Sequence, residues 1–245
     1  MLLKERFESA GKWLFRWRSF LPLLTIGLFL IDMRQFSYPR GEHYLDLLWE
    51  GISLVVSLFG LAIRVFTVGY APKGTSSRTT SKPKASTLNT TGMYSIVRHP
   101  LYMGNFFIWL GVSMCPRFLF FAIAIILLFF LYYGLIILAE EKVLYEKFGN
   151  TFVEWTHKTP PLFPRFSNWQ KAALPFSLKA VLKREHSTFF AIIAVFTCLE
   201  IGGDLFYSGK LVFDPVWVSI FLTGLCTYVI LLTLKKKGSL DVEGR

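Results

Sequence analysis

Residues 118–139 read FLFFAIAIILLFFLYYGLIILA, a run of 22 residues without a charged side chain. About 20 apolar residues, each rising about 1.5 Å along a helix, cross the roughly 30 Å hydrocarbon core of a bilayer. The run therefore predicts a transmembrane helix. The whole chain of 245 residues agrees with this reading, because 53% of it is hydrophobic and its mean hydropathy is +0.46.

Five more apolar segments accompany this helix. They lie near residues 19–31, 45–70, 101–114, 187–207 and 212–234. The segment 101–114 is shorter than a full span, and Pro116 separates it from the helix that follows. Glu50 and Arg64 lie inside the second segment, where charged groups mark a bundle interior or a polar cavity unless they extend toward the helix ends. We predict an all-α, polytopic transmembrane helix bundle with about six crossings.

The positions of Lys and Arg predict how the bundle is oriented. All but five of the 27 such residues fall in the N-terminal segment, in loops 71–100 and 140–186, or at the C-terminus; the exceptions are Arg34, Arg40, Arg64, Arg117 and Lys210. Because cytosolic loops are rich in Lys and Arg, we place both termini on the cytosolic side. The net charge of +11 would then face anionic lipid headgroups rather than nucleic acid.

Three other expectations concern the parts outside the apolar runs. Residues 169–186 are basic and amphipathic, which predicts a helix lying on the membrane surface. Cys115, Cys198 and Cys226 lack the paired spacing of a disulfide framework or a metal site. We also expect no cleavable signal peptide, since no small-residue cleavage site follows the first apolar run.

The stretch Arg98-His99-Pro100-Leu101-Tyr102 stands where the chain enters the membrane. Pro100 can open a helix, and the helix N-terminus behind it suits a carboxylate or another anion. Gly104, one turn further, would let a ligand or another helix approach closely. A simpler reading has Arg98 on a lipid phosphate and Tyr102 in an interfacial aromatic belt.

Glu140 and Glu141 end the helix that begins at residue 118. The negative end of the helix dipole disfavours two adjacent carboxylates there, so they need a cationic partner. Arg98 and the ammonium group of a ligand are both candidates. Alternatively, the pair is a solvated helix end beside Lys142 and Lys147.

The two stretches GMYSIVRHPLYMG (92–104) and EEKVLYEKFGNTFVEWTHKTPPLFP (140–164) occur in this order, joined by a helical hairpin. Together they resemble the signature of the isoprenylcysteine carboxyl methyltransferase and phospholipid methyltransferase family of membrane enzymes. The resemblance divides the chain into residues 1–71 with the first two membrane helices, a catalytic core over 72–168, and residues 169–245 beyond it.

That resemblance implies transfer of a methyl group from S-adenosylmethionine to a lipidic acceptor at the cytosolic side. The residues expected to bind this cofactor are Ser86, Thr87, Leu88, Asn89, Tyr94, His99, Pro100, Leu101, Tyr102, Gly104 and Glu140. Arg98 would orient an anionic acceptor or the cofactor carboxylate. Glu141 would assist as a structural or catalytic helper.

Departures from the family pattern bear on the acceptor. Ile136 stands where the prenylcysteine enzymes carry an Arg that faces the substrate carboxylate, which favours a lipid phosphate or amine headgroup over a prenylated cysteine. Phe152 and Trp155 replace Tyr residues found in many members. Two non-enzymatic alternatives remain: a transporter or channel lined by Glu50 and Arg64, and a membrane scaffold that does not bind S-adenosylmethionine.

Overall fold

The computed structural model describes residues 10, 11, 13, 14, 16, 43–75 and 87–245. The helices are α3 (His43–Tyr70), α4 (Met93–Ile96), α5 (Pro100–Met114), α6 (Leu119–Phe148), α7 (Asn150–Lys158), the 3₁₀ helix η3 (Phe166–Asn168), α8 (Leu178–Ser208) and α9 (Pro215–Lys236). The described part of the chain contains no strand. The predicted all-α class is therefore confirmed.

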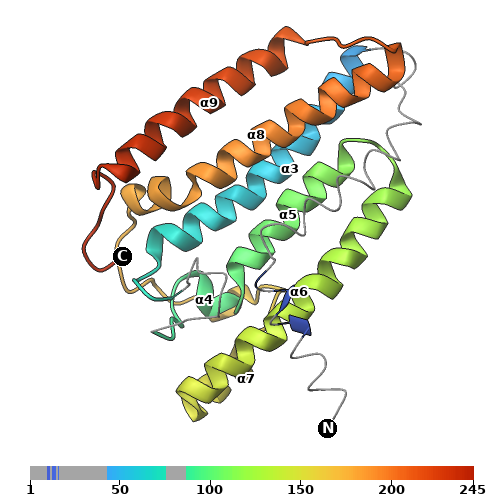
Figure 1. The fold of residues 1–245 in the computed structure, drawn as a ribbon. Coiled ribbons are helices and arrows are strands. Elements are labelled where there is room, and N and C mark those ends of the chain that lie inside the picture. The colour runs from blue at the N-terminus through green and yellow to red at the C-terminus, as the bar shows by residue number, and fades with distance from the viewer. Residues whose placement is uncertain (1–9, 12, 15, 17–42, 76–86) are drawn as a thin grey trace.

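Five long helices lie side by side in the order α9, α8, α3, α5 and α6 (Figure 1). Helix α3 packs on both α5 and α8, while α9 covers α8 and α6 covers α5. We call one end of this bundle the α7 end, because α4 and α7 lie there. The opposite end holds the turn between α5 and α6 and the turn between α8 and α9.

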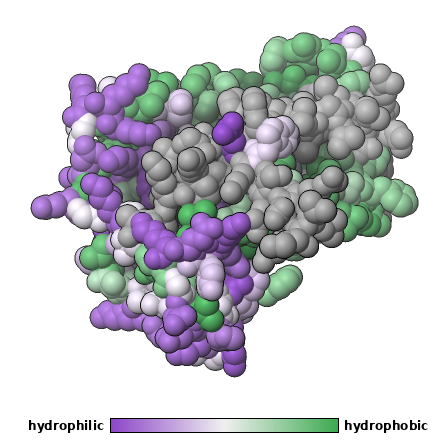
Figure 2. Space-filling view, turned by 60° about the horizontal axis from the view of Figure 1, so that its bottom comes forward, coloured by the Kyte–Doolittle hydropathy of each residue, from purple (hydrophilic) through white to green (hydrophobic). Residues whose placement is uncertain are grey.

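Within the described part of the chain, four helices are long and apolar enough to cross a membrane, namely α3, α6, α8 and α9. They correspond to four of the six predicted apolar segments. Helix α5 has 15 residues, so it is about 22 Å long and falls short of a bilayer core of roughly 30 Å. The predicted segment near 19–31 lies outside the described residues. Figure 2 shows a face on which hydrophilic side chains gather toward the lower left and hydrophobic ones toward the right.

The predicted surface helix over residues 169–186 is wrong. Residues 169–177 form no helix, and α8 begins at Leu178, where the Ser177 side chain accepts a hydrogen bond from the backbone N–H of Ala180 at 3.3 Å. Pro175 explains why residues 169–177 form no helix, because proline lacks the N–H that a helix interior requires. The basic second half continues into the bundle as the first turns of α8.

Helices α3 and α5 approach each other closely through glycine. A Cβ atom on Gly104 would lie 2.6 Å from Cγ of Arg64 and 2.8 Å from the carbonyl oxygen of Gly60. Gly60 occupies the matching position on α3. Of the two roles predicted for Gly104, close approach of a helix is therefore the one seen here, and it brings α3 against the first turns of α5.

Candidate functional site

The segment before α5 is held in place by the segment after α7. The backbone N–H groups of Arg98 and His99 donate to the carbonyl oxygens of Pro160 and Pro161, at 2.9 and 3.1 Å. His99 occupies the N-cap position of α5, and Pro100 is the first residue of that helix, as predicted. These contacts bring the two sequence motifs together.

His99 lies between the adjacent glutamates Glu140 and Glu141. The prediction that these two residues end their helix is wrong, because α6 continues for about two more turns to Phe148. Its Nε2 atom is 3.1 Å from Oε1 of Glu141, and its Nδ1 atom is 3.6 Å from Oε2 of Glu140. The same Oε1 atom of Glu141 is 2.9 Å from Nε of Arg98. Arg98 also donates from Nη1 to the backbone oxygen of Thr156 at 3.2 Å. The predicted pairing of Arg98 with the glutamates is confirmed for Glu141. We call these four charged or titratable side chains the His99 site.

The His99 site is shielded on its basic side and more open on its acidic side. The side chains of His99 and Arg98 are 7% and 12% exposed, against 22% for Glu140 and 20% for Glu141. Nε of Arg98 makes no hydrogen bond among the described residues, so its contact with Glu141 is purely ionic. Neither a solvated helix end nor an arginine directed at lipid describes this arrangement.

Aromatic rings continue the site into the bundle. The ring of His99 stacks on that of Tyr102 at 5.5 Å between centroids, and Tyr102 is 4.7 Å from Tyr133. Ile136 is fully buried in the same cluster. Tyr102 therefore faces the interior of the bundle and not a lipid interface. Ile136 places an apolar side chain where the prenylcysteine enzymes are expected to carry an arginine.

The residues before Arg98 that were predicted to bind the cofactor make a separate set of contacts. Leu88 packs against a buried cluster of Tyr94, Phe152 and Trp155, and the indole of Trp155 donates to the carbonyl oxygen of Tyr94 at 3.1 Å. The Asn89 side chain accepts hydrogen bonds from the backbone and hydroxyl of Thr91, both at 3.1 Å. Thr87 precedes this turn, and Leu101 lies in the first turn of α5. Ser86 lies outside the described residues.

A polar network inside the bundle was not predicted from the sequence. Nε and Nη2 of Arg64 lie 2.8 and 3.0 Å from the two carboxylate oxygens of Glu185, and Nη1 donates to Oδ1 of Asn105 at 2.6 Å. Nδ2 of Asn105 donates to the hydroxyl of Tyr133 at 2.9 Å. These four residues, which we call the Arg64 network, join α3, α5, α6 and α8. A charged residue inside an apolar segment indicates such a network. Arg64 lies inside the predicted segment 45–70, whereas Glu185 lies just before the segment that begins near residue 187.

Glu50 lies far from the His99 site, near the opposite end of the bundle. Its side chain is buried, at 2% exposure, and accepts a hydrogen bond from the indole of Trp217 at 2.8 Å. The predicted bundle-interior position is confirmed, and the alternative of an extension toward the helix end is wrong for Glu50. Along α3 the 14-position step from Glu50 to Arg64 corresponds to about 21 Å. The two charges therefore belong to separate clusters and not to the lining of one pathway.

Comparison with known proteins shows which family and which relatives the chain is similar to. Residues 48–151 match the family described as phospholipid methyltransferase. The cobalt-zinc-cadmium resistance protein CzcN of Cupriavidus metallidurans is 34% identical over 124 residues, which cover 49% of this chain and 55% of that protein. The nickel-cobalt-cadmium resistance protein NccN of Alcaligenes xylosoxydans xylosoxydans is 37% identical over 153 residues, covering 61% of this chain and 68% of that protein. No solved structure matches the chain significantly.

Proposed function

The chain belongs to the phospholipid methyltransferase family, and from that premise we propose that it transfers a methyl group from S-adenosylmethionine to a lipidic acceptor. The observation that supports this most is the meeting of Arg98 and His99 with two glutamates at the start of α5. S-adenosylmethionine, when bound, supplies an electrophilic methyl group on a positively charged sulfur.

The His99 site has groups suited to each part of this cofactor. Carboxylates and aromatic faces stabilise ammonium and sulfonium groups, and an arginine or a helix N-terminus stabilises a carboxylate. Oε1 of Glu141 is already within 3.1 Å of His99 and 2.9 Å of Arg98. We therefore assign the cofactor ammonium to Glu140, and we assign to Glu141 the task of holding Arg98 and His99 in position.

The burial of the site suits methyl transfer, in which the protein mainly aligns the reactants and excludes water. A phosphate oxygen needs no base, whereas an amine must lose a proton, which a carboxylate of the His99 site would accept. Ile136 offers no cation to a substrate carboxylate. We propose a lipid phosphate or amine headgroup as the acceptor, with a prenylated cysteine as the alternative.

The experiment is transfer of labelled methyl from S-adenosylmethionine by the purified protein in detergent into a total membrane lipid extract. We expect label in one lipid class and at least a 100-fold lower rate in Glu140→Gln. Glu146→Gln, an exposed glutamate on the same helix, serves as the control and should retain the rate. Label in prenylated peptides alone would select the alternative acceptor, and a folded protein that binds no S-adenosylmethionine would refute the proposal.

The names of the two relatives suggest a setting for this activity. They are named for resistance to cobalt, zinc, cadmium and nickel, and we propose that methyl transfer by this chain supports growth in the presence of such metals. Removing the chain from its host should then lower the metal concentration that stops growth, and Glu140→Gln should fail to restore it. Normal tolerance in the strain without the chain would contradict this setting.

A further inference from the structure

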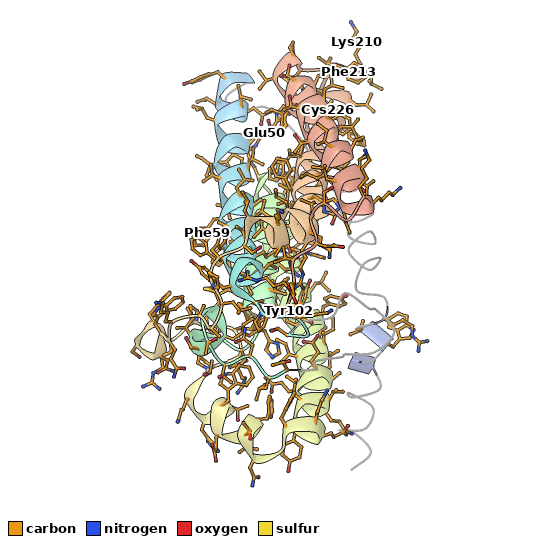
Figure 3. The ribbon with its side chains drawn as sticks, turned by 90° about the vertical axis from the view of Figure 1, so that its left-hand side faces the viewer. Glu50, Phe59, Tyr102, Lys210, Phe213 and Cys226 are labelled. Atoms are coloured by element: carbon orange, nitrogen blue, oxygen red, sulfur yellow. The ribbon has the colours of Figure 1, made fainter. Side chains whose placement is uncertain are left out.

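Three buried carboxylates meet at the opposite end of the bundle from the His99 site. Asp46 and Glu50 lie one turn apart on α3, and Glu200 reaches them from α8; one oxygen of each lies within 4.8 Å of the other two. We call these three residues the carboxylate cluster. Figure 3 shows Glu50 toward one end of the bundle and Tyr102 toward the other, so this cluster is separate from the His99 site.

Two of the three carboxylates have donors from outside the cluster among the described residues, and the third has none. Asp46 pairs with Arg117. Glu50 accepts from the Trp217 indole at 2.8 Å, and the thiol of Cys115 lies 3.9 Å from its other oxygen. Within the described part of the chain, both oxygens of Glu200 lack a hydrogen-bond donor from outside the cluster, although Glu200 is only 1% exposed. Within the cluster, the Glu50 carboxyl is close enough to share a proton with Glu200.

This arrangement is costly unless a positive species completes it. A buried carboxylate without a donor loses its hydration and gains nothing in return, and like charges at this separation repel each other. Phe196 and Trp217, whose rings stack at 6.0 Å, lie in the apolar core beside the cluster. The oxygens of Glu200 therefore face a place where a cation, or a shared proton, would stabilise the fold.

We propose that Asp46, Glu50 and Glu200 bind a divalent transition-metal ion, with Cys115 supplying a sulfur ligand. Carboxylate oxygens bind zinc at about 2.0–2.2 Å and thiolates at about 2.3 Å, so the oxygens of a tetrahedral site lie about 3.3–3.6 Å apart. The three carboxylate oxygens lie within 4.8 Å of one another, and the Cys115 sulfur lies 3.9 Å from Glu50. An ion would therefore draw these side chains together by about 1 Å. Three oxygens and one sulfur suit zinc or cobalt better than magnesium or calcium, which prefer sites made of oxygen alone.

The test uses the full chain, purified in detergent, stripped with a chelator and titrated with Zn²⁺ or Co²⁺. We expect one tightly bound ion per chain, at least 100-fold weaker binding in Glu200→Gln, and unchanged binding in the exposed control Glu146→Gln. With Co²⁺, we also expect a thiolate-to-metal absorption band that disappears in Cys115→Ser. No tight binding by the folded protein, or equal binding by Glu200→Gln, would overturn the proposal.

Infrared spectroscopy of the unmodified chain keeps the proposal testable if Glu200→Gln does not fold. Metal binding requires ionised carboxylates. Addition of Zn²⁺ should therefore shift the carboxylate stretching bands and abolish any band from protonated carboxyl groups in the cluster. A protonated carboxyl band that persists at saturating Zn²⁺ would show that the cluster holds a proton, and it would refute the metal site. Neither experiment depends on methyl transfer, so failure here leaves the proposed activity standing.

Discussion

The two ends of the bundle handle buried charge in different ways. At the α7 end, Glu140 and Glu141 face Arg98 and His99. The carboxylate of Glu185 accepts hydrogen bonds from Nε and Nη2 of Arg64. At the opposite end, Arg117 pairs with Asp46, and Glu200 has no donor from outside the carboxylate cluster among the described residues. The comparison teaches that the protein's own cations balance the carboxylates of the first end, whereas the second, within the described part of the chain, has more carboxylates than cations and is suited to a cation from outside.

The largest effect should follow from breaking the charge balance at the α7 end. Arg64→Met leaves the carboxylate of Glu185 buried without its partner, and removing one member of a buried ion pair costs about 3–5 kcal/mol. We expect a loss of this size in the free energy of unfolding in detergent. The double variant Arg64→Met/Glu185→Met should recover most of it, since no charge is then left unpaired. A single variant as stable as the unmodified chain would mean that the Arg64 network does not stabilise this end.

A second test addresses the His99 site directly. Glu141→Gln keeps the shape of the side chain but removes the charge that holds Arg98 and His99. We expect kcat/KM for methyl transfer to fall by about 100-fold, equivalent to roughly 2.7 kcal/mol of transition-state stabilisation. Circular dichroism should show the helices intact. A rate within threefold of that of Glu146→Gln would contradict the positioning role of Glu141.

The close packing of α3 on α5 supports both ends and can be tested with a pair of glycines. A Cβ atom on Gly60 would lie 2.7 Å from the backbone nitrogen of Ile108, whereas one on Gly134 of α6 meets nothing within 4 Å. Gly60→Ala should therefore lower the free energy of unfolding by about 1–3 kcal/mol. Gly134→Ala should leave it unchanged or raise it by up to about 1 kcal/mol. Equal effects in thermal unfolding would show that α3 and α5 have room to separate.

The smallest expected effect concerns the link between the Arg64 network and the aromatic cluster. Tyr133→Phe keeps the ring beside Tyr102 but removes the hydroxyl that accepts a hydrogen bond from Asn105. We expect a loss of about 1 kcal/mol, the usual value for one hydrogen bond. A double-mutant cycle with Asn105→Leu measures the coupling between the two side chains. A coupling energy of zero would show that Asn105 and Tyr133 act independently.

Long apolar runs and helix boundaries could be read from the sequence because they depend on local composition. Residues 119–139 of the apolar run lie within α6, and Pro100 opens α5. Arg98 could be named as a cationic partner from the two adjacent carboxylates, and it pairs with Glu141. These carboxylates do not end their helix as predicted, because α6 continues to Phe148. The residues expected to bind the cofactor remain predictions, and the structure brings His99, Tyr102 and Glu140 to one place.

The remaining contacts depend on how distant segments pack. Arg64 and Glu185 are 121 residues apart, and nothing in either segment indicates its partner. Glu200 and Asp204 are the acidic residues of the apolar segment 187–207, and nothing in that segment indicates a partner for either. The meeting of Glu200 with Asp46 and Glu50 follows only from α8 packing on α3. The predicted surface helix failed for a related reason, because Glu185 and the buried Ala180 and Val181 draw the start of α8 into the bundle.

The most direct test of the whole account is equilibrium binding of S-adenosylmethionine to the purified, folded protein, with zinc binding measured on the same preparation. We expect the unmodified chain to bind the cofactor, and Glu140→Gln to bind it at least 30-fold more weakly while retaining its single zinc ion. That result would assign methyl transfer to the α7 end and metal binding to the other. A folded chain that binds no S-adenosylmethionine would contradict the central claim that the His99 site is a methyltransferase site.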